Sequence, residues 1–416
     1  MSKLDELIKE LCPNGCEYRA LEECCTILDR KRKPVTKAAR VAGQYPYYGA
    51  NGIQDYVADY IFDGTFVLVG EDGSVITPSG TPVVTWATGK IWVNNHAHII
   101  EEKGDVLLRY LYHYLQIVDV TPLIHGNIPK LTGGDFKALQ IPVPPLAVQE
   151  EIVRILDNFT SLTAELTAEL TARKKQYEYY RDELLTFGSD AQCGTALREC
   201  GMSGRSAPNC NNVTWKTLGE LFPNIRNGFV GTITPYFTTK DKGVRYLEGT
   251  NIHNGIISDN EVLYVTQEFH QKHIKNELKS DDILMVQSGH IGECAVVGEK
   301  YKGANCHALI IMSNGGKCNS KFYCHYFHSH EGYKSLTPAM TGGTVKHVLA
   351  TKMKNIKVPV PPIEIQNKIV SILDRFDSLC NDISEGLPAE IEARQKQYEY
   401  YRDALLNYAA KGVAAL

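Results

Sequence analysis

Basic side chains that could bind phosphate are unevenly distributed along this chain. Residues 213–357 carry 17 Lys and Arg against 12 Asp and Glu, and hold nine of the 13 histidines, although the whole chain has a formal net charge of −4. In the first half, residues 30–33 (Arg-Lys-Arg-Lys) form a local basic cluster, followed by Lys37 and Arg40. Such clusters either bind phosphate or form a solvated surface, and charge alone does not decide between these interpretations.

Cysteine and histidine side chains that could hold a metal ion gather near the end of the second half. This set consists of Cys318, Cys324, His325, His328 and His330. Cys12 and Cys16 are a weaker second candidate. Zinc sites built from thiolates contain cysteine pairs at a characteristic short spacing, and such pairs are missing from the sequence. We therefore predict no metal site.

Motifs for catalysis are absent from the sequence. The two Pro-Pro pairs follow Val143 and Val360, so neither has the amide or carboxylate of the Asp/Asn-Pro-Pro-aromatic motif for amino methylation. Residues 88–91 (Thr-Gly-Lys-Ile) lack the first glycine and the Ser/Thr of a phosphate-binding loop. The sequence contains neither Gly-x-Ser-x-Gly nor His-Glu-x-x-His. We therefore expect no catalytic residue in this chain.

The elements that must position these side chains occur twice. The segment Lys-Gln-Tyr-Glu-Tyr-Tyr-Arg-Asp fills residues 175–182 and again 396–403 without a mismatch. Each copy lies downstream of a proline run, at 141–145 and at 358–362. The parts before these runs match more faintly but in the same order. Repetition at this distance indicates two homologous halves, each a globular part followed by a long helix.

The long helices are predicted from the spacing of apolar residues. Helical periodicity runs from 149 to 185, and a second helix starts near Gln366 and should break at Gly386-Leu-Pro388. Two such helices from equivalent halves most simply pack as an antiparallel pair. The first helix contains a smaller tandem repeat of Thr-Ala-Glu-Leu at 163–170. This repeat is either helical filler or a ruler that sets a distance.

The globular parts are predicted to be mixed α/β. Residues 66–69 and 283–286 read as strands that run into Gly-x-x-Gly turns, 83–86 and 91–93 as further strands, and 110–115 and 322–327 as helices. The expected fold class is α+β, with two pseudo-symmetric α/β domains and two long antiparallel helices that form a coiled-coil spacer. The predicted division is a first domain at 1–140, a central helical spacer at 141–187, a linker at 188–212, a second domain at 213–357 and a distal helical spacer at 358–416.

The sequence gives no indication of a membrane. No apolar run approaches the ~20 residues that a membrane span needs. The opening Met-Ser-Lys-Leu-Asp-Glu lacks the apolar core of a signal peptide. We expect a cytoplasmic protein whose 12 cysteines are thiols rather than disulfides.

The order of a globular part, a Pro-x-Pro-Pro-x-x-x-Gln helix, a second globular part and a second such helix resembles the specificity subunits of type I restriction–modification systems. Two further motifs resemble features of the same family, namely the helix ends Lys-Gln-Tyr-Glu-Tyr-Tyr-Arg-Asp-x-Leu-Leu and the Thr-Ala-Glu-Leu repeat. The resemblance covers the whole chain. It implies that each globular part is a target-recognition domain for one half of a split, asymmetric site in double-stranded DNA.

The resemblance also implies partners. The helices would dock two modification subunits, which bind S-adenosylmethionine and methylate adenine. Restriction subunits would add ATP- and Mg-dependent translocation and cleavage. The chain itself would hold no cofactor and no catalytic residue, in agreement with the missing motifs.

The same resemblance turns several polar side chains into candidate DNA contacts. Lys and Arg suit phosphates or guanine, and Asn suits adenine. In the first domain the candidates are Arg30, Lys31, Arg32, Lys33, Lys37, Asn51, Lys90 and Lys130. In the second domain they are Arg226, Lys240, Lys242, Arg245, Asn251, Ser288, His290, Lys346 and His347.

The two identical segments are predicted to be partner-docking surfaces. Three tyrosines in four positions cover too wide an arc for one helical stripe, and Tyr and Arg are favoured at interfaces. Packing on the chain's own domains is the alternative. The residues concerned are Tyr177, Tyr179, Tyr180, Arg181, Tyr398, Tyr400, Tyr401 and Arg402.

Two other classes of protein compete with this interpretation. A coiled-coil adaptor that does not bind nucleic acid would explain the long helices but not the basic second domain. A stand-alone enzyme would explain neither the duplication nor the missing motifs. The DNA bases that a specificity subunit recognises do not follow from the sequence, because they depend on which side chains reach the groove.

Overall fold

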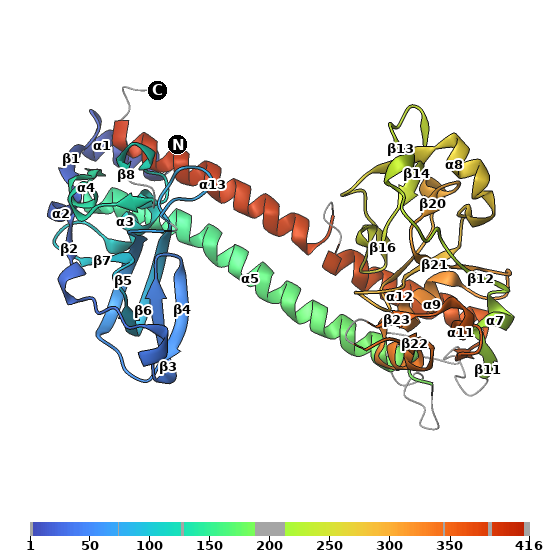
Figure 1. The fold of residues 1–416 in the computed structure, drawn as a ribbon. Coiled ribbons are helices and arrows are strands. Elements are labelled where there is room, and N and C mark those ends of the chain that lie inside the picture. Colours follow the sequence, from blue (N-terminus) through green and yellow to red (C-terminus); the bar gives the residue numbers. More distant parts are fainter. Residues whose placement is uncertain are drawn as a thin grey trace, which may run out of the picture. The chain divides into compact units, whose positions relative to one another are not determined.

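The computed structural model of the chain describes residues 3–73, 75–125, 129–187, 213–343, 346–381 and 385–411. The chain forms two compact units (Figure 1). Unit 1 comprises Met1–Thr167 and Glu390–Leu416, and unit 2 comprises Ala168–Ala389. The first border falls inside one long helix, whose beginning belongs to unit 1 and whose end belongs to unit 2. The predicted linker at 188–212 lies outside the described residues.

Unit 1 is built on one mixed sheet. In the described part of the unit its strand order is β2 (Cys25–Ile27), β7 (Ala97–Glu102), β5 (Phe62–Gly70), β6 (Val84–Val93), β3 (Ala42–Gly49) and β4 (Gly52–Val57). Successive side chains of a strand point to opposite faces. Val67 and Val69 therefore pack with helix α3 (Leu108–Leu115), whereas Phe66 and Leu68 belong to a second apolar cluster. Both faces of β5 are thus buried.

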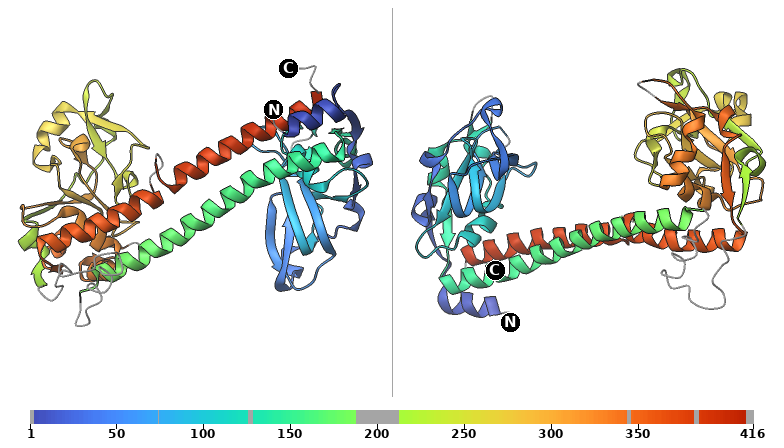
Figure 2. Two further views of the ribbon diagram at one scale, coloured as in Figure 1. Left: turned by 180° about the vertical axis from the view of Figure 1, so that it is seen from behind. Right: turned by 90° about the horizontal axis from the view of Figure 1, so that it is seen from below.

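Smaller elements complete unit 1. They are the helices α1 (Lys3–Leu11), α2 (Leu21–Cys24) and α4 (Gly133–Ala138), the 3-10 turns η1 (Asp29–Lys31), η2 (Lys37–Ala39) and η3 (Thr121–Leu123), and the hairpin of β8 (Ile124–His125) with β9 (Lys130–Leu131). Helix α1 lies beside the start of the long helix (Figure 2), where Lys3 Nζ is 3.0 Å from Glu151 Oε2. Among the described residues, no helix combines the length and the apolar character needed to cross a membrane.

Unit 2 divides its strands between two larger sheets. One has the order β12 (Asn224–Asn227), β21 (Leu309–Ser313), β18 (Ile283–Val286), β19 (Cys294–Val296). The other has the order β13 (Phe237–Thr238), β17 (Leu263–Thr266), β14 (Gly243–Leu247), β20 (Asn305–Cys306). As in β5, alternate residues of β18 are buried on opposite faces, with Ile283 and Met285 towards helix α9 (Ser320–His328) and Leu284 and Val286 away from it.

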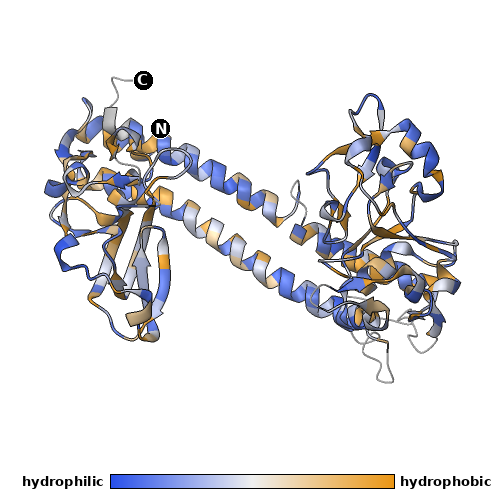
Figure 3. Cartoon of the chain, in the orientation of Figure 1, coloured by the Kyte–Doolittle hydropathy of each residue, from blue (hydrophilic) through white to orange (hydrophobic). Residues whose placement is uncertain are grey.

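The remaining described elements of unit 2 are short, apart from its last helix. They are the helices α7 (Leu218–Leu221), α8 (Gln267–Lys272), α10 (His330–Ser335), α11 (Ala350–Met353) and α12 (Ile363–Asn381), the 3-10 turns η5 (Thr234–Tyr236), η6 (Gly249–Asn251), η7 (Ile274–Asn276), η8 (Glu299–Tyr301) and η9 (Thr337–Ala339), and the hairpins β15 (Ile252–His253) with β16 (Ile256–Ile257) and β22 (Met340–Thr341) with β23 (His347–Val348). Figure 3 shows hydrophobic residues gathered in the strands of each globular part.

The proline runs close each domain with a two-stranded ladder. In unit 1, β1 (Glu17–Ala20) pairs with β10 (Gln140–Val143), and in unit 2, β11 (Thr214–Thr217) pairs with β24 (Lys357–Val360). A tyrosine of α3 reaches the first ladder, and a tyrosine of α9 reaches the second. Tyr110 Oη donates to the carbonyl of Pro142 at 2.9 Å, and Tyr323 Oη donates to that of Pro359 at 3.0 Å. The two halves therefore share their construction and not only their sequence.

The glutamine of the Pro-x-Pro-Pro-x-x-x-Gln motif fixes the start of each long helix. Gln149 Oε1 accepts a hydrogen bond from the backbone N–H of Leu107 at 2.9 Å, and its Nε2 donates to the proline carbonyl five positions earlier at 2.8 Å. Gln366 makes the equivalent bonds with Asn319 at 2.9 Å and with the proline five positions earlier at 2.8 Å. Both amides are buried, and a buried amide needs such partners.

The long helices agree with their prediction. Helix α5 (Leu146–Leu185) has 40 residues, and the second run consists of α12 and α13 (Leu387–Lys411), with the break at Gly386 and Pro388 in the first turn of α13. In unit 1, Phe159 of α5 stacks on Tyr401 of α13 at 5.3 Å. In unit 2, Tyr180 of α5 stacks on Phe376 of α12 at 5.8 Å. This order of contacts is that of an antiparallel pair. Both units also combine helices with sheets, so the predicted α+β fold class is confirmed.

One predicted boundary was wrong. Residues 83–86 and 91–93 were expected to form separate strands, but β6 runs without interruption from Val84 to Val93. Its middle residues continue the antiparallel ladder with β5, where Gly89 pairs with Gly64 and Lys90 with Asp63. Gly89 has φ +81°, a conformation that glycine adopts without strain. The Thr-Gly-Lys stretch is therefore strand and not a loop.

Candidate nucleic-acid interface

A loop and a hairpin meet in unit 1 at the end of β5. The loop at 70–73 follows β5, and the β8–β9 hairpin lies against it through a bridge between Asp72 and Lys130. The backbone N–H of Gly73 also donates to the carbonyl of Pro129 at 3.0 Å. Gly73 has φ +78°, which is why this turn needs glycine. We call this region, residues 70–73 with 124–125 and 129–131, junction 1.

Unit 2 repeats this arrangement at the end of β18. The loop at 287–292 carries the second Gly-x-x-Gly turn, and the β22–β23 hairpin pairs with it through a bridge between Ser288 and His347. The backbone N–H of Val348 donates to the carbonyl of Gln287 at 2.9 Å. We call residues 287–292 with 340–343 and 346–348 junction 2. Four of the predicted DNA contacts come together here on an exposed surface, namely Ser288, His290, Lys346 and His347.

An acidic side chain of junction 1 pairs with two basic side chains, one inside the junction and one outside it. Glu71 Oε2 is 2.6 Å from Arg32 Nη1, and Glu71 Oε1 is 3.3 Å from Lys130 Nζ. Arg32 also donates to the carbonyls of Ala97 and Asp29, and only 11% of its side chain is exposed. Arg32 is therefore an internal brace, and its prediction as a DNA contact is corrected. Lys130 stays 46% exposed beside the same carboxylate.

The rest of the basic cluster lies on the surface of unit 1. Its backbone is anchored, because Trp92 Nε1 donates to the carbonyl of Lys33 at 2.7 Å and the N–H of Lys33 donates to that of Val93 at 3.3 Å. With the backbone fixed in this way, the charged ends remain available. The exposed members are Arg30, Lys31, Lys33 and Lys37.

Two further candidates of unit 1 sit on the β3–β6 side of the sheet. Asn51 is exposed in the turn between β3 and β4. Lys90 is exposed on β6, and its Nζ lies 4.6 Å from the centre of the Tyr60 ring. Both side chains are accessible, so both remain predicted contacts.

Two arginines of unit 2 are used inside the protein. Arg226 on β12 donates to Ser313 Oγ at 2.7 Å and to the carbonyl of Glu277 at 3.0 Å. Arg245 on β14 donates to the carbonyls of Tyr246 at 2.7 Å and Leu263 at 3.1 Å. The guanidinium fork, with its five N–H donors, suits such carbonyl clusters. Both side chains are mostly buried, so their prediction as DNA contacts is corrected.

Asn251 also differs from its prediction. Only 1% of the residue is exposed. Its Oδ1 accepts from the backbone N–H of Glu248 at 2.9 Å, and its Nδ2 donates to the carbonyls of Ser258 and Glu261. The amide therefore closes a turn and has no capacity left for a base. Lys240 and Lys242, in contrast, are exposed in the turn between β13 and β14.

The repeated segments bind the globular parts through a histidine and an aspartate. In unit 1, Tyr398 Oη is 3.0 Å from His113 Nδ1, and His113 Nε2 is 2.8 Å from Asp157 Oδ1. A carboxylate only accepts, so Nε2 carries the proton and Nδ1 accepts from the tyrosine hydroxyl. Burial lowers the pKa of His113, despite the opposing hydrogen bond to Asp157. We call Tyr398, His113 and Asp157 network 1.

Unit 2 contains an equivalent network, in which a lysine replaces the arginine that pairs with the aspartate. Tyr177 Oη is 3.5 Å from His325 Nδ1, and His325 Nε2 is 3.0 Å from Asp374 Oδ1. Lys321 Nζ lies 2.7 Å from Asp374 Oδ2, where network 1 has Arg109 Nε at 2.8 Å from Asp157 Oδ1. We call Tyr177, His325 and Asp374 network 2. The identical segments are therefore held by equivalent groups in the two units.

The predicted docking surface is consequently only partly exposed. Tyr177 and Tyr398 point inward, and Arg181 and Arg402 lie over their rings at 5.5 and 5.6 Å. These four residues hold each helix on its own unit, which is the alternative of packing on the chain's own domains. Tyr180 and Tyr401 stack on apolar rings of the partner helix. The middle tyrosines face outward, with Tyr179 55% exposed and Tyr400 70% exposed.

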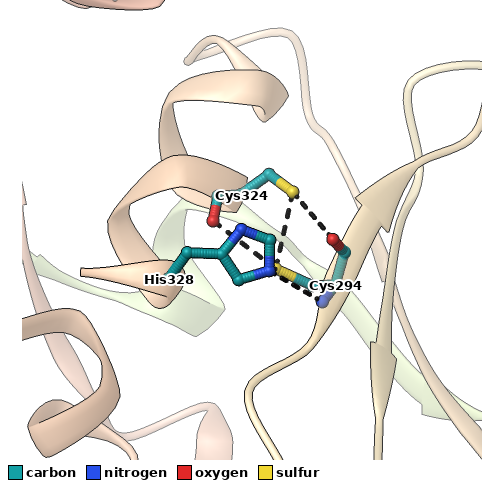
Figure 4. Close-up of side chains that lie close together, drawn as sticks. All are labelled: Cys294, Cys324 and His328. Atoms are coloured by element: carbon teal, nitrogen blue, oxygen red, sulfur yellow. Dashed lines mark hydrogen bonds between the residues drawn. The ribbon is translucent and has the colours of Figure 1, made fainter. Parts of the chain in front are cut away.

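The cysteines and histidines near α9 are arranged differently from the sequence-based set. Cys324 and His328 meet Cys294 of β19 (Figure 4), with the two Sγ atoms 3.5 Å apart. His325 belongs to network 2, Cys318 Sγ contacts Asn314, and the backbone N–H of His330 donates to Asp182. Sequence reasoning missed Cys294, because it lies on a strand 30 positions before Cys324 with no motif spacing between them.

Comparison with known proteins identifies where this architecture occurs. The profile of the family described as type I restriction modification DNA specificity domain matches residues 13–173 and 212–393. A type I restriction enzyme specificity subunit of Haemophilus influenzae is 37% identical over 404 residues, which cover 94% of this chain and 96% of that protein. The specificity subunit of the Escherichia coli enzymes EcoR124I/EcoR124II is 34% identical over 318 residues, covering 74% and 72%. The crystal structure of an S subunit from M. genitalium has the same fold, with a TM-score of 0.52 and 15% identity over 96% of this chain and 97% of that one.

Proposed function

Because the chain belongs to the family of type I restriction modification DNA specificity domains, we propose that each unit reads one short half of a bipartite, asymmetric DNA site. The observation that carries this proposal is the repeated junction. The bridges Asp72–Lys130 and Ser288–His347 place a Gly-x-x-Gly loop against a hairpin in both units. The framework is shared but the side chains differ, so the two halves of the site should differ in sequence.

The chemistry of the two junctions supports different tasks. Beside junction 1, an exposed basic strip (Arg30, Lys31, Lys33 and Lys37) supplies cations for phosphates. Junction 2 combines one lysine with hydroxyl and imidazole groups, which can donate to and accept from base edges. We retain 1–140 and 213–357 as the two recognition domains.

We further infer that the exposed tyrosines Tyr179 and Tyr400 dock two modification subunits, one on each identical segment. Exposed aromatic side chains on a rigid helix are suited to this task. The chemistry of methylation and cleavage, with S-adenosylmethionine, ATP and Mg, would then belong to the modification and restriction subunits and not to this chain. Such a complex works on DNA, so we place the protein in the cytoplasm. Native mass measurement that finds one modification subunit at saturation would contradict the two-site arrangement.

A domain exchange tests the proposed division of labour. Residues 1–140 are replaced by the corresponding domain of a relative with another target, and methylated sites are mapped across the genome of the host. We expect one half-site to change while the other half-site stays the same. A change in both half-sites would refute the modular proposal. The competing idea of an adaptor that does not bind DNA predicts no sequence-specific methylation with either chain, provided that the modification subunits are present.

A further inference from the structure

Three donor atoms that metals favour converge between a strand and a helix of unit 2. Cys294 comes from β19, and Cys324 and His328 come from α9 (Figure 4). Positions four apart lie on the same face of a helix, so α9 presents both side chains to the strand. The two cysteines are buried and the imidazole is nearly so. Their ligand atoms all lie within 4.8 Å of one another.

The distances within this cluster match a tetrahedral zinc site. Zn–S bonds of ~2.3 Å and Zn–N bonds of ~2.0 Å place two sulfurs about 3.8 Å apart and a sulfur and a nitrogen about 3.5 Å apart. In the structure, the two Sγ atoms are 3.5 Å apart, and Cys294 Sγ is 3.6 Å from His328 Nε2. Both distances are within a few tenths of an ångström of the tetrahedral values, about the tolerance expected for such sites. The third pair, Cys324 Sγ and His328 Nε2, lies within 4.8 Å, so the imidazole or the Cys324 side chain would close up on binding an ion.

The cluster also offers a fourth ligand and a path for the ion. A cavity of about 350 Å³ is lined by Cys324 and His328. Another of about 480 Å³ is lined by His328 and Glu293. Glu293 Oε2 lies 3.8 Å from His328 Nε2. Either this carboxylate or a water from the cavities would complete the tetrahedron.

Hydrogen bonds also join the three side chains of the cluster. Without an ion, the Cys324 thiol donates to the carbonyl of Cys294 at 3.1 Å, and the N–H of Cys294 donates to His328 Nε2 at 3.2 Å. The corresponding contact in unit 1 is made by Trp86 of β6 and Tyr112 of α3, whose ring centres are 5.6 Å apart. Two aromatic rings therefore suffice to join strand and helix there. Unit 2 uses two soft sulfur donors and an imidazole for the same task.

We propose that Cys294, Cys324 and His328 bind one zinc ion, which fastens α9 to the sheet of unit 2. Two thiols and one imidazole are the ligand types that suit this borderline-soft ion. Binding converts the thiols to thiolates and releases their protons to solvent. The ion would brace the helix that carries His325 of network 2, and hence the attachment of Tyr177.

The test uses the full chain with Cys193, Cys200 and Cys210 replaced by serine, since these residues lie outside the described part of the structure and could bind metal on their own. After reduction and removal of metal, zinc is added and unbound ions are removed. We expect about one zinc per chain by elemental analysis. Co²⁺ in place of zinc should give the intense visible absorption of a tetrahedral ion and a thiolate-to-metal charge-transfer band. A chain that retains no zinc and gives no such spectrum would refute the proposal.

Matched variants identify the ligands. Cys294→Ser and Cys324→Ser should lose the stoichiometric ion, and His328→Gln should weaken its binding. Cys318→Ser, which removes another buried thiol of unit 2, should leave binding unchanged. If the ligand variants misfold, alkylation of the unsubstituted cluster decides the matter, because zinc must slow the labelling of Cys294 and Cys324 more than that of Cys318. Equal labelling with and without zinc would overturn the assignment. So would the finding that Cys294 and Cys324 form a disulfide and that the reduced protein binds no zinc.

Discussion

Tyr398 and His113 are 285 positions apart in the sequence, yet Tyr398 Oη lies 3.0 Å from His113 Nδ1. Tyr177 and His325 have the same relationship across 148 positions, at 3.5 Å. The helix of the second half thus completes the domain of the first half in unit 1, and the helix of the first half completes the domain of the second half in unit 2. The tyrosine at the equivalent position of each segment therefore fits an equivalent histidine and aspartate in the two units.

Removing the Tyr398 hydroxyl should weaken unit 1. Tyr398→Phe leaves the buried Nδ1 of His113 without its donor, and an unsatisfied buried acceptor costs about 1–3 kcal/mol. We expect lower resistance to urea and faster hydrogen exchange in α3 and α13. Tyr400→Phe is the matched control, because the same change is made in the same segment at a residue that is 70% exposed. Equal effects of the two substitutions would show that network 1 does not hold the helix.

Unit 1 should lose stability in mildly acidic solution because of His113. Burial, and to a lesser degree Arg109 and Arg402, lower the pKa of His113 and outweigh the opposing effect of Asp157. An unfolded histidine takes up its proton near pH ~6.5, whereas the folded one does so only at lower pH. Below ~6.5 the unfolded state therefore binds more protons, and the free energy of unfolding falls as the pH falls.

The variant His113→Gln isolates this contribution. Other histidines with lowered pKa, such as His273, titrate in both chains, so the difference between the two profiles reports His113. Burial raises the pKa of Asp157, but its hydrogen bonds with His113 and Arg109 bring it below its ordinary value, so its own effect belongs to more acidic solution. We expect thermal unfolding of the variant to depend less on pH as the pH falls below ~6.5. Parallel profiles would contradict the assignment.

Lysines at the junctions should contribute to the salt dependence of DNA binding. Each phosphate contact adds about one unit to the slope of log K against log salt. In a complex assembled with modification subunits, Lys346→Ala should flatten the slope by about that amount. Lys130→Ala should have a smaller effect, since Lys130 must give up its partner Glu71 to reach a phosphate. Lys334→Ala is the control, because Lys334 is exposed but lies outside junction 2. Unchanged slopes for both junction variants would remove these residues from the interface.

The Thr-Ala-Glu-Leu repeat should control the spacing between the half-sites. One more unit after Leu170 lengthens α5 by ~6 Å and rotates the remainder of the helix by ~40°. At ~3.4 Å per base pair, the unread spacer of the DNA site should grow by about one to two base pairs while both half-sites stay the same. Methylome sequencing of a host with the altered chain measures this directly. Full activity with the original spacer would show that the repeat is filler.

The sequence by itself determined the architecture of this protein. Helices and strands arise from patterns among neighbouring residues, so periodicity located α5, and Gly386 with Pro388 located the break before α13. The duplicated motifs established two homologous halves. The order of these motifs along the chain also indicated the family. Duplication and motif order can both be read directly from the positions of residues in the sequence.

Only the tertiary structure decided which polar side chains are available. Arg32 meets Glu71 across 39 positions and Arg226 meets Ser313 across 87, and no local pattern reports such pairings. The same limit concealed Cys294 beside Cys324 and His328, and it made Tyr398 look like docking surface when it is only 5% exposed. Burial and hydrogen bonding depend on residues that the fold brings together from distant parts of the chain. A charged or aromatic residue in sequence is therefore a candidate, and the fold determines whether it serves the protein's own packing or a partner.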